Sequence, residues 1–174
     1  MALPGCSISV GVDGQQALVR LEGRLAAESA PAFEKVILRL RSGGVGCVVL
    51  DLSGALLMDS GFSGTLTRLV ATGGISFALH GAPQRILDGL EDHGVLDLVG
   101  VLEAGSTSAP TRTVEVPMEA PARADVLRCC LDAHRALMAL KPENVAKFQT
   151  VEAFLSREVG KLAEVAATTT RSGW

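Results

Sequence analysis

The order of apolar and polar residues predicts an opening pair of antiparallel strands followed by a buried strand. Apolar side chains occupy every second position in residues 7–12, and Asp13-Gly14 is a strong hairpin turn signal before a second strand over residues 16–23. Residues 45–52 form a nearly continuous apolar run that is rich in β-branched side chains. Such runs are typical of strands covered on both faces, which usually belong to parallel sheets.

Helices are predicted between these strands. Ser29 is expected to cap a helix that has Pro31 in its first turn and ends at Ser42-Gly43-Gly44. Because strands and helices alternate, the sequence predicts an α/β fold: a mainly parallel sheet of four to five strands with an N-terminal antiparallel hairpin and helices packed on it. The remaining expected elements are helices over residues 60–71 and 83–92, and strands over residues 75–80 and within 98–102.

The composition changes after the α/β domain, which is expected to span residues 1–104. Residues 105–122 have the composition of a linker, which includes a candidate short strand. Helical spacing of apolar residues predicts a helical hairpin over residues 123–167, followed by a frayed tail over residues 168–174. The apolar stripe of the hairpin covers a face of the sheet or pairs within itself. The alternative is a homodimer, because two helices alone bury little surface.

Charge and composition argue against nucleic-acid and membrane partners. The formal net charge is −3 and aromatic residues make up 3% of the chain, so the basic footprint and the stacking aromatics of a nucleic-acid-binding protein are missing. No apolar run approaches the roughly 20 residues that span a bilayer, and no membrane segment is expected. The four cysteines show no CxxC spacing, which indicates reduced thiols in a cytoplasmic protein.

Few side chains suggest catalysis, and we expect no enzyme activity, no metal and no cofactor. The three histidines are not paired at the spacing of metal ligands, so structural roles are expected for them. The glycine-rich residues 42–46 precede a strand and not a helix, which does not fit a phosphate-binding loop. Residues 61–64 read Gly-Phe-Ser-Gly and are followed by Thr65, so they do not match the GxSxG pattern of serine hydrolases.

The most informative stretch is residues 48–65, where a buried strand is followed by a short loop and a helix that begins near Asp59-Ser60. One interpretation is a plain N-cap, in which side-chain oxygens accept hydrogen bonds from free N–H groups of the first turn. The other is a phosphorylation switch. A helix N-terminus favours a phosphate, and the added charge beside Asp59 would repel a docked partner. The residues alone leave both interpretations open.

Two motifs lie at this strand and helix: Val48-Val49-Leu50-Asp51-Leu52-Ser53-Gly54 and Met58-Asp59-Ser60-Gly61-Phe62-Ser63-Gly64-Thr65-Leu66. Together with Leu21-Glu22-Gly23-Arg24-Leu25 and the order of elements, they make residues 8–104 resemble a STAS domain, the fold of bacterial anti-sigma factor antagonists. The hairpin resembles C-terminal extensions of some bacterial STAS proteins, in which the stretches at residues 133–137 and 144–148 recur.

The resemblance implies a partner switch. In this family an unphosphorylated antagonist binds an anti-sigma factor that is also a serine kinase, and phosphorylation at the start of the helix ends the binding. The resemblance therefore implies a non-enzymatic signalling protein that binds such a factor through the loop and helix Leu57–Arg68. The residues expected to contact the partner are Met58, Asp59, Ser60, Gly61, Phe62, Ser63 and Thr65.

The acceptor position departs from the family pattern. The family's acceptor is the residue after Ser60, which here is Gly61 and has no hydroxyl group. Either Ser60, or Ser63 one turn later, is a displaced acceptor, or the protein is not switched in this way. The alternative function is a STAS scaffold or sensor module that binds a small ligand or self-assembles. The partner hypothesis also requires that the corner at Asp59-Ser60 faces solvent.

Overall fold

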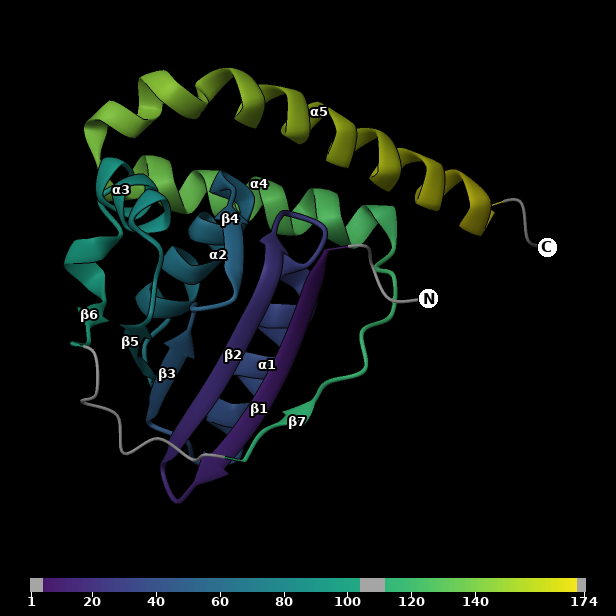
Figure 1. Ribbon diagram of the computed structural model, residues 1–174. Coiled ribbons are helices and arrows are strands. Elements are labelled where there is room, and N and C mark those ends of the chain that lie inside the picture. Colours follow the sequence, from purple (N-terminus) through teal and green to yellow (C-terminus); the bar gives the residue numbers. More distant parts are fainter. Residues whose placement is uncertain (1–4, 104–111, 172–174) are drawn as a thin grey trace.

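A computed structural model describes residues 5–103 and 112–171, with side chains up to residue 168. The strands form one mixed sheet in the order β6-β5-β3-β2-β1-β7, and β4 pairs with β2 outside this path (Figure 1). The strands are β1 (Cys6–Asp13), β2 (Gln16–Leu25), β3 (Cys47–Asp51), β4 (Ala55–Met58), β5 (Ser76–His80), β6 (Gly100–Val101) and β7 (Val114–Glu115). The helices are α1 (Ala30–Ser42), α2 (Ser60–Ala71), α3 (Gln84–Asp92), α4 (Arg123–Leu140) and α5 (Pro142–Arg171), with a 3₁₀ turn η1 (Leu96–Leu98).

The predicted hairpin and the parallel centre of the sheet are confirmed. β1 pairs antiparallel with β2 through a turn in which Gly14 has a φ of +57°, a conformation that glycine adopts without steric cost. β3 lies parallel to both β2 and β5. Its residues Val48 and Leu50 are fully buried. A strand with neighbours on both sides and cover on both faces explains the continuous apolar run in the sequence.

The sheet has seven strands in the described part of the chain, more than the predicted four to five. β4 lies in a stretch that the sequence pattern treats as a loop, and it joins β2 beyond a register shift at Gly23/Arg24. β7 pairs with β1 at two positions and confirms the candidate short strand of the predicted linker. Both strands are too short to show a period of two, and their conformation depends on hydrogen bonding to a longer neighbour.

Two expectations about helix ends are wrong. Ser29 precedes α1 but makes no side-chain cap, because its hydroxyl donates to the carbonyl oxygen of Ala26 at 2.8 Å. Pro31 is in the first turn, where its missing N–H leaves one donor fewer to satisfy. α5 continues to Arg171, past the predicted end at residue 167. Residues 104–111 of the predicted linker region and residues 172–174 of the predicted tail lie outside the described residues.

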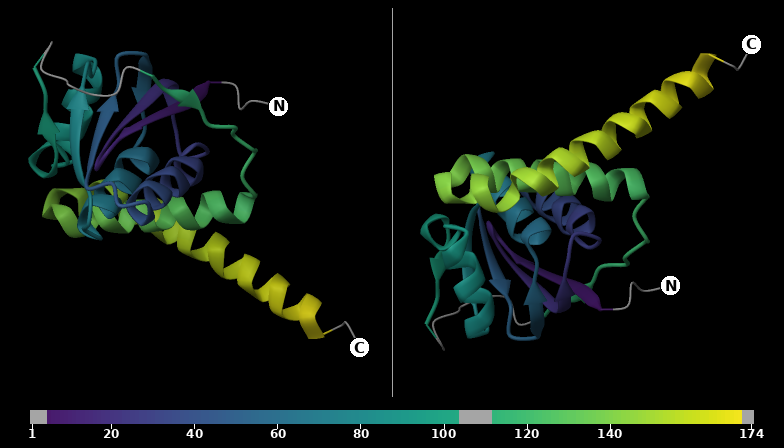
Figure 2. Two further views of the ribbon diagram at one scale, coloured as in Figure 1. Left: turned by 90° about the horizontal axis from the view of Figure 1, so that it is seen from below. Right: turned by 90° about the horizontal axis from the view of Figure 1, so that it is seen from above.

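The helices form successive layers on one face of the sheet. α1 and α2 lie directly on it, α4 crosses the outer side of α2, and α5 packs against α4 (Figures 1 and 2). Between the sheet and the first layer, Phe33 of α1 stacks on Phe62 of α2 with ring centroids 4.8 Å apart. The hairpin α4–α5 therefore pairs within itself, and it covers a helix of the domain and not the sheet.

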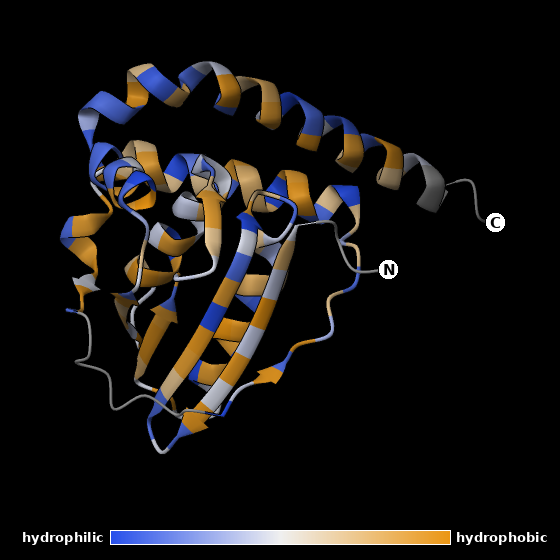
Figure 3. Ribbon diagram, in the orientation of Figure 1, coloured by the Kyte–Doolittle hydropathy of each residue, from blue (hydrophilic) through white to orange (hydrophobic). Residues whose placement is uncertain are grey.

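α5 is longer than α4 and projects past it (Figure 2). Arg123, the first residue of α4, lies 3.6 Å from the carboxylate of Glu158, so the rest of α5 extends beyond its partner helix. Apolar residues continue along this projecting part (Figure 3). Phe154 is 51% exposed and Val165 is 65% exposed.

Two features of the whole chain bear on its chemistry. All four cysteines are free thiols. Within residues 5–103 and 112–171, none of the helices combines the length and the apolar character needed to cross a membrane.

The Phe33–Phe62 stack predicts a large stability loss when either ring is removed. Phe62→Ala should lower the free energy of unfolding by about 3–5 kcal/mol, because it leaves a cavity between α1, α2 and the sheet. Phe154→Ala is the matched control, since that ring is half-exposed and its loss should cost less than about 0.5 kcal/mol. Urea titrations followed by circular dichroism measure both values, and equal losses would contradict the assignment of the core.

Candidate partner-binding site at the start of α2

Asp59 closes the N-terminus of α2 with both oxygens of its carboxylate. Oδ1 accepts a hydrogen bond from the Phe62 N–H at 2.9 Å, and Oδ2 accepts one from the Ala27 N–H at 2.9 Å. The first bond satisfies a free donor of the opening turn, and the second ties the helix to the loop after β2. The N-cap interpretation of Asp59 is confirmed by this geometry.

Gly61, at the acceptor position of the family pattern, faces the loop after β2. A Cβ atom built on Gly61 would lie 2.9 Å from the Cβ of Ala27 and 3.3 Å from its Cα. Side-chain carbons do not approach this closely in packed interiors. A serine or threonine at position 61 would therefore force the loop away from α2, although Asp59 holds the Ala27 amide in place.

Ser60 is hydrogen-bonded to a histidine of α4. Its Oγ lies 3.0 Å from His134 Nε2, and the other ring nitrogen, Nδ1, lies 2.7 Å from the carbonyl oxygen of Cys130. A carbonyl oxygen only accepts, so Nδ1 carries the proton and Nε2 accepts from the Ser60 hydroxyl. His134 is 4% exposed. The hydroxyl of Ser60 therefore points into protein.

Ser63 lies one turn later and is 2% exposed. Its hydroxyl is 3.2 Å from Nδ1 of His93, which follows α3. Phe148 of α5 lies between two histidines, with ring centroids 5.3 Å from His93 and 5.2 Å from His134, and it meets both edge-on. Asn144 donates to the carbonyl oxygen of His93 at 2.9 Å. These contacts fasten the turn between α4 and α5 to the end of α3.

α2 and α4 cross at their smallest residues. A Cβ atom on Gly64 would lie 2.4 Å from the carbonyl oxygen of Ala133 and 2.8 Å from its Cβ, so the two backbones touch. Nearby, Thr65 Oγ1 lies 3.5 Å from Cys129 Sγ and donates to the carbonyl oxygen of Gly61 at 2.9 Å. Only glycine allows an approach this close, so the crossing of α2 and α4 requires glycine at position 64.

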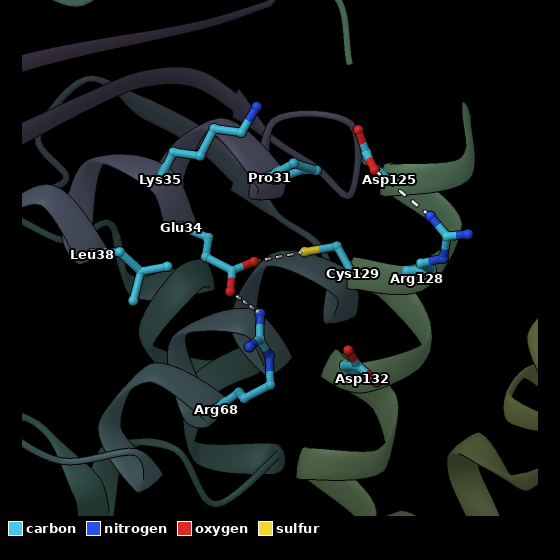
Figure 4. Close-up of a pocket in the computed structure, with 9 residues that line it drawn as sticks. All are labelled: Pro31, Glu34, Lys35, Leu38, Arg68, Asp125, Arg128, Cys129 and Asp132. Carbon is cyan, nitrogen blue, oxygen red and sulfur yellow. Dashed lines mark hydrogen bonds and ion pairs between the residues drawn. The ribbon is translucent and has the colours of Figure 1, made fainter. Parts of the chain in front are cut away.

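A cleft of about 320 Å³ opens between α1, α2 and α4 beside this crossing (Figure 4). Arg68 of α2 lies in it, with Nη2 2.6 Å from Oε1 of Glu34 on α1. Burial opposes the charge, but the hydrogen bond and the charge of Glu34 raise the pKa of Arg68. The Nε of Arg68 is buried without a hydrogen-bond partner. The packing of α4 against α1 and α2 is therefore incomplete on this side.

The two adjacent cysteines of α4 are not reactive thiols. Burial raises the pKa of Cys130 to about 11, and the negative charge of Asp59 adds to the effect. Burial also raises the pKa of Cys129, against the hydrogen bond from Thr65. Thiols with raised pKa values stay protonated at neutral pH and are poor nucleophiles and metal ligands.

The Asp-Leu-Ser motif at the end of β3 forms a polar cluster on the sheet. Asp51 accepts hydrogen bonds from the Ser53 hydroxyl at 2.6 Å and from Arg20 Nε at 2.9 Å, and His80 Nδ1 lies 3.6 Å away. Burial opposes the charge, but these hydrogen bonds lower the pKa of Asp51. The cluster joins the ends of β3 and β5 to the middle of β2. No group of three or more potential metal ligands occurs among the residues that the structure describes.

The expectation that the Asp59-Ser60 corner faces solvent is wrong. The predicted contact residues do lie together at the start of α2, but residues 61–67 are buried and residues 57–60 are half-buried. α4 covers Ser60 and Gly64, and the core and the loop after β2 cover Phe62 and Gly61. Sequence reasoning missed Ala133, His134 and Phe148 as neighbours of this site. The sequence did contain one signal for a close neighbour of α2. Gly61 and Gly64 are three residues apart, so a helix places two residues without side chains near one another, where another segment can approach.

The sequence of the folded part matches a known family. The family model described as "Mlab, STAS domain" matches residues 8–102, more than half of the 174 residues. The chain belongs to the STAS domain family. The resemblance over residues 8–104 is thereby confirmed, and the hairpin α4–α5 lies outside the matched part of this STAS protein.

Three solved structures are similar to this STAS protein. The protein TM1081, determined by NMR, is 18% identical over 54% of this chain and 78% of its own, with a TM-score of 0.49. The unphosphorylated form of the anti-sigma factor antagonist SpoIIAA is 17% identical over 56% and 89%, with a TM-score of 0.47. An anti-sigma factor antagonist from Mycobacterium paratuberculosis is 16% identical over 58% and 89%, with a TM-score of 0.49. No curated protein matches the chain.

The half-buried His93 predicts that this STAS protein loses stability at mildly acid pH. Burial lowers the pKa of His93 below 6.5, although the charge of Asp92 opposes the shift. The unfolded chain therefore binds this proton more readily, so the contribution to stability is present above pH 6.5 and is lost as the pH falls through the folded-state pKa. In urea titrations from about pH 7 to pH 5, the unfolding free energy should fall less in His93→Gln than in the wild type. Equal slopes would contradict the prediction.

Proposed function

We propose that this chain is a non-enzymatic STAS adaptor that binds a protein partner through Leu57–Arg68 when α4 no longer covers that segment. The observation that carries the proposal is the start of α2. There Asp59 fixes the first turn, and Ser60 places a hydroxyl beside it at the point where the family motif presents its partner-binding helix. The partner that the motif implies is a serine-kinase-type anti-sigma factor.

The chemistry of the surrounding side chains supports binding over catalysis. The Ser60–His134 pair has the spacing of a nucleophile and its base, but the imidazole is held by a backbone carbonyl and is nearly buried. The neighbouring thiol of Cys130 stays protonated because burial raises its pKa to about 11. The docked α4 closes this corner to a substrate and to a partner alike. Once α4 moves away, a protonated thiol and an imidazole held by a backbone carbonyl favour a contact surface over a catalytic site.

Ser60 is the proposed phosphoryl acceptor within this surface. It lies in the first turn of α2, where free N–H groups and the helix dipole stabilise a phosphate. Ser63 is the second candidate and is more deeply buried. Transfer of the γ-phosphoryl group from ATP to the Ser60 hydroxyl would release ADP and break the hydrogen bond between Ser60 and His134. It would also add roughly −1.5 to −2 charges beside Asp59.

Phosphorylation predicts a mass change that depends on one hydroxyl. Full-length protein incubated with the kinase-like anti-sigma factor of its own genome and ATP should gain about 80 Da in intact mass, the mass of one phosphoryl group. Ser60→Ala should abolish the gain, and Ser63→Ala, the matched control one turn later, should retain it. A gain that persists in Ser60→Ala would assign the acceptor elsewhere, and no gain in the wild type would mean that phosphorylation does not switch the protein.

Partner binding itself is tested by pull-down with the tagged full chain. Met58→Glu places a charge at the half-buried entrance to α2 and should weaken binding of the kinase-like anti-sigma factor by about tenfold or more, because a charge at an interface centre must be desolvated. Val101→Glu, on the exposed edge strand β6, is the control and should bind like the wild type. Failure of every kinase-like anti-sigma factor of the genome to bind would contradict the proposed function.

A specific observation favours self-association as a second candidate function. α5 exposes Phe154 where it runs along α4 and Val165 in its projecting part, and exposed apolar stripes on helices are stabilised by pairing. We expect light scattering with size exclusion to give a dimer for the wild type and a monomer for Phe154→Arg. Val12→Arg, at an equally exposed position on β1, is the control. A monomeric wild type would contradict the homodimer.

A further inference from the structure

α4 occupies the face of α2 that the proposed function assigns to a partner. The hydroxyl of Ser60 bonds His134, and the backbone of Gly64 touches Ala133. A partner that reads this face cannot share it with α4, because no layer of side chains separates the two helices at Gly64. The two must therefore occupy the face in turn.

The hydrogen bonds between α2 and α4 are weak. They join neutral groups, Ser60 with His134 and Thr65 with Cys129, and each is worth about 0.5–1.5 kcal/mol net or less. The cleft beside Arg68, with its Nε left without a partner, shows that the contact is not fully packed (Figure 4). Water can replace these interactions when the helices part.

The core of the domain is largely independent of the hairpin. The main buried cluster is made of residues from β1 to the end of the matched STAS region, and the hairpin adds only Cys129, Leu137 and Phe148 to its buried members. The chain enters α4 through residues 116–122, which form neither helix nor strand, and β7 before them pairs with β1 at two positions. Release of the hairpin would therefore leave the sheet, α1 and α2 together.

We propose that α4 is an internal competitor of the partner, so that the hairpin α4–α5 keeps the α2 face closed until it is displaced. This inference rests on the proposed function, which makes the α2 face the partner's site. A tethered helix competes at a high effective concentration, and the apparent affinity for the partner falls by the fraction of chains that are open.

The geometry also limits which helices can dock on the α2 face once α4 has left it. Such a helix must carry a small residue opposite Gly64, because Ala133 is fully buried there and lies against the α2 backbone, which leaves little room for a larger side chain. The next residue must offer a hydrogen-bonding side chain to Ser60, as His134 does. The partner's contact is therefore a helix with a small residue followed directly by a polar one.

Two full-length variants test displacement without any partner. Ala133→Leu places a large side chain where α4 touches Gly64, so its hairpin no longer fits its own α2. Gly64→Leu closes the α2 face but leaves the contact surface of its own α4 intact. Tagged Ala133→Leu chains should capture untagged Gly64→Leu chains about tenfold or more better than tagged wild-type chains do, because only the first pair offers both a free face and a free helix.

The matched control is Ala139→Leu, the same substitution at an exposed position of α4, which should capture no more than the wild type. Amide hydrogen exchange of β3 and β5 should stay slow in Ala133→Leu. If these strands lose protection together with α2, the hairpin belongs to the core and the proposal is wrong. An Ala133→Leu chain with a protected sheet that captures nothing also overturns it.

A reversible clamp provides a second test that keeps Ala133 and Gly64. Thr65 Oγ1 and Cys129 Sγ are 3.5 Å apart, so Thr65→Cys allows a disulfide between α2 and α4 on oxidation at alkaline pH, where the raised pKa of Cys129 no longer keeps its thiol protonated. Amide exchange in α2 should be about tenfold or more slower in the oxidised than in the reduced form of the same chain, because the clamp removes the open state. Equal rates in the two forms overturn the proposal.

The kinase-like anti-sigma factor distinguishes this inference from the proposed function. It should bind the reduced Thr65→Cys chain and not the oxidised one, and it should bind Ala133→Leu more tightly than the wild type. Equal binding to the oxidised and reduced chains overturns the competition and leaves the proposed function intact. Absence of binding to every form, Ala133→Leu included, overturns both.

Discussion

The close crossing of α2 and α4 is the interaction on which the rest of the arrangement depends. Gly64 has no side chain, so the carbonyl of Ala133 can rest against the α2 backbone. This approach brings His134 within hydrogen-bond distance of Ser60 and lets Phe148 enter between two imidazoles. With a bulkier residue at position 64, α4 would stand off and none of these contacts would form.

The composition of α2 follows from its place between the sheet and α4. Phe62 and Leu66 fill the core beneath it, and the opposite face consists of small and hydroxyl-bearing residues. Buried hydroxyls must be paired. Thr65 and Thr67 donate to carbonyl oxygens one turn back in their own helix. Their hydroxyl groups are therefore already paired when α4 packs against this face. A helix covered on both sides can therefore carry more polar atoms than a core helix usually does.

The parts of the fold that were predictable from the sequence are those encoded by local periodicity. The hairpin of β1 and β2, the buried β3 and the start of α2 each have a period or a turn signal of their own, and the Asp59 cap needs only its neighbours. β4 and β7 depend on a longer strand elsewhere in the chain. The cover on α2 was not predictable in this way, because the apolar stripe of the hairpin fits a sheet, a helix or a second copy equally well.

Gly64 also makes substitutions in α2 depend on whether the hairpin α4–α5 is docked. As long as the hairpin docks, a mutation at position 64 to any residue with a side chain is opposed by the backbone of Ala133. A descendant that lost the hairpin would be released from that restriction and could exchange the glycine for a better helix former. A relative with a large side chain at this position therefore could not hold a hairpin in the same docked arrangement.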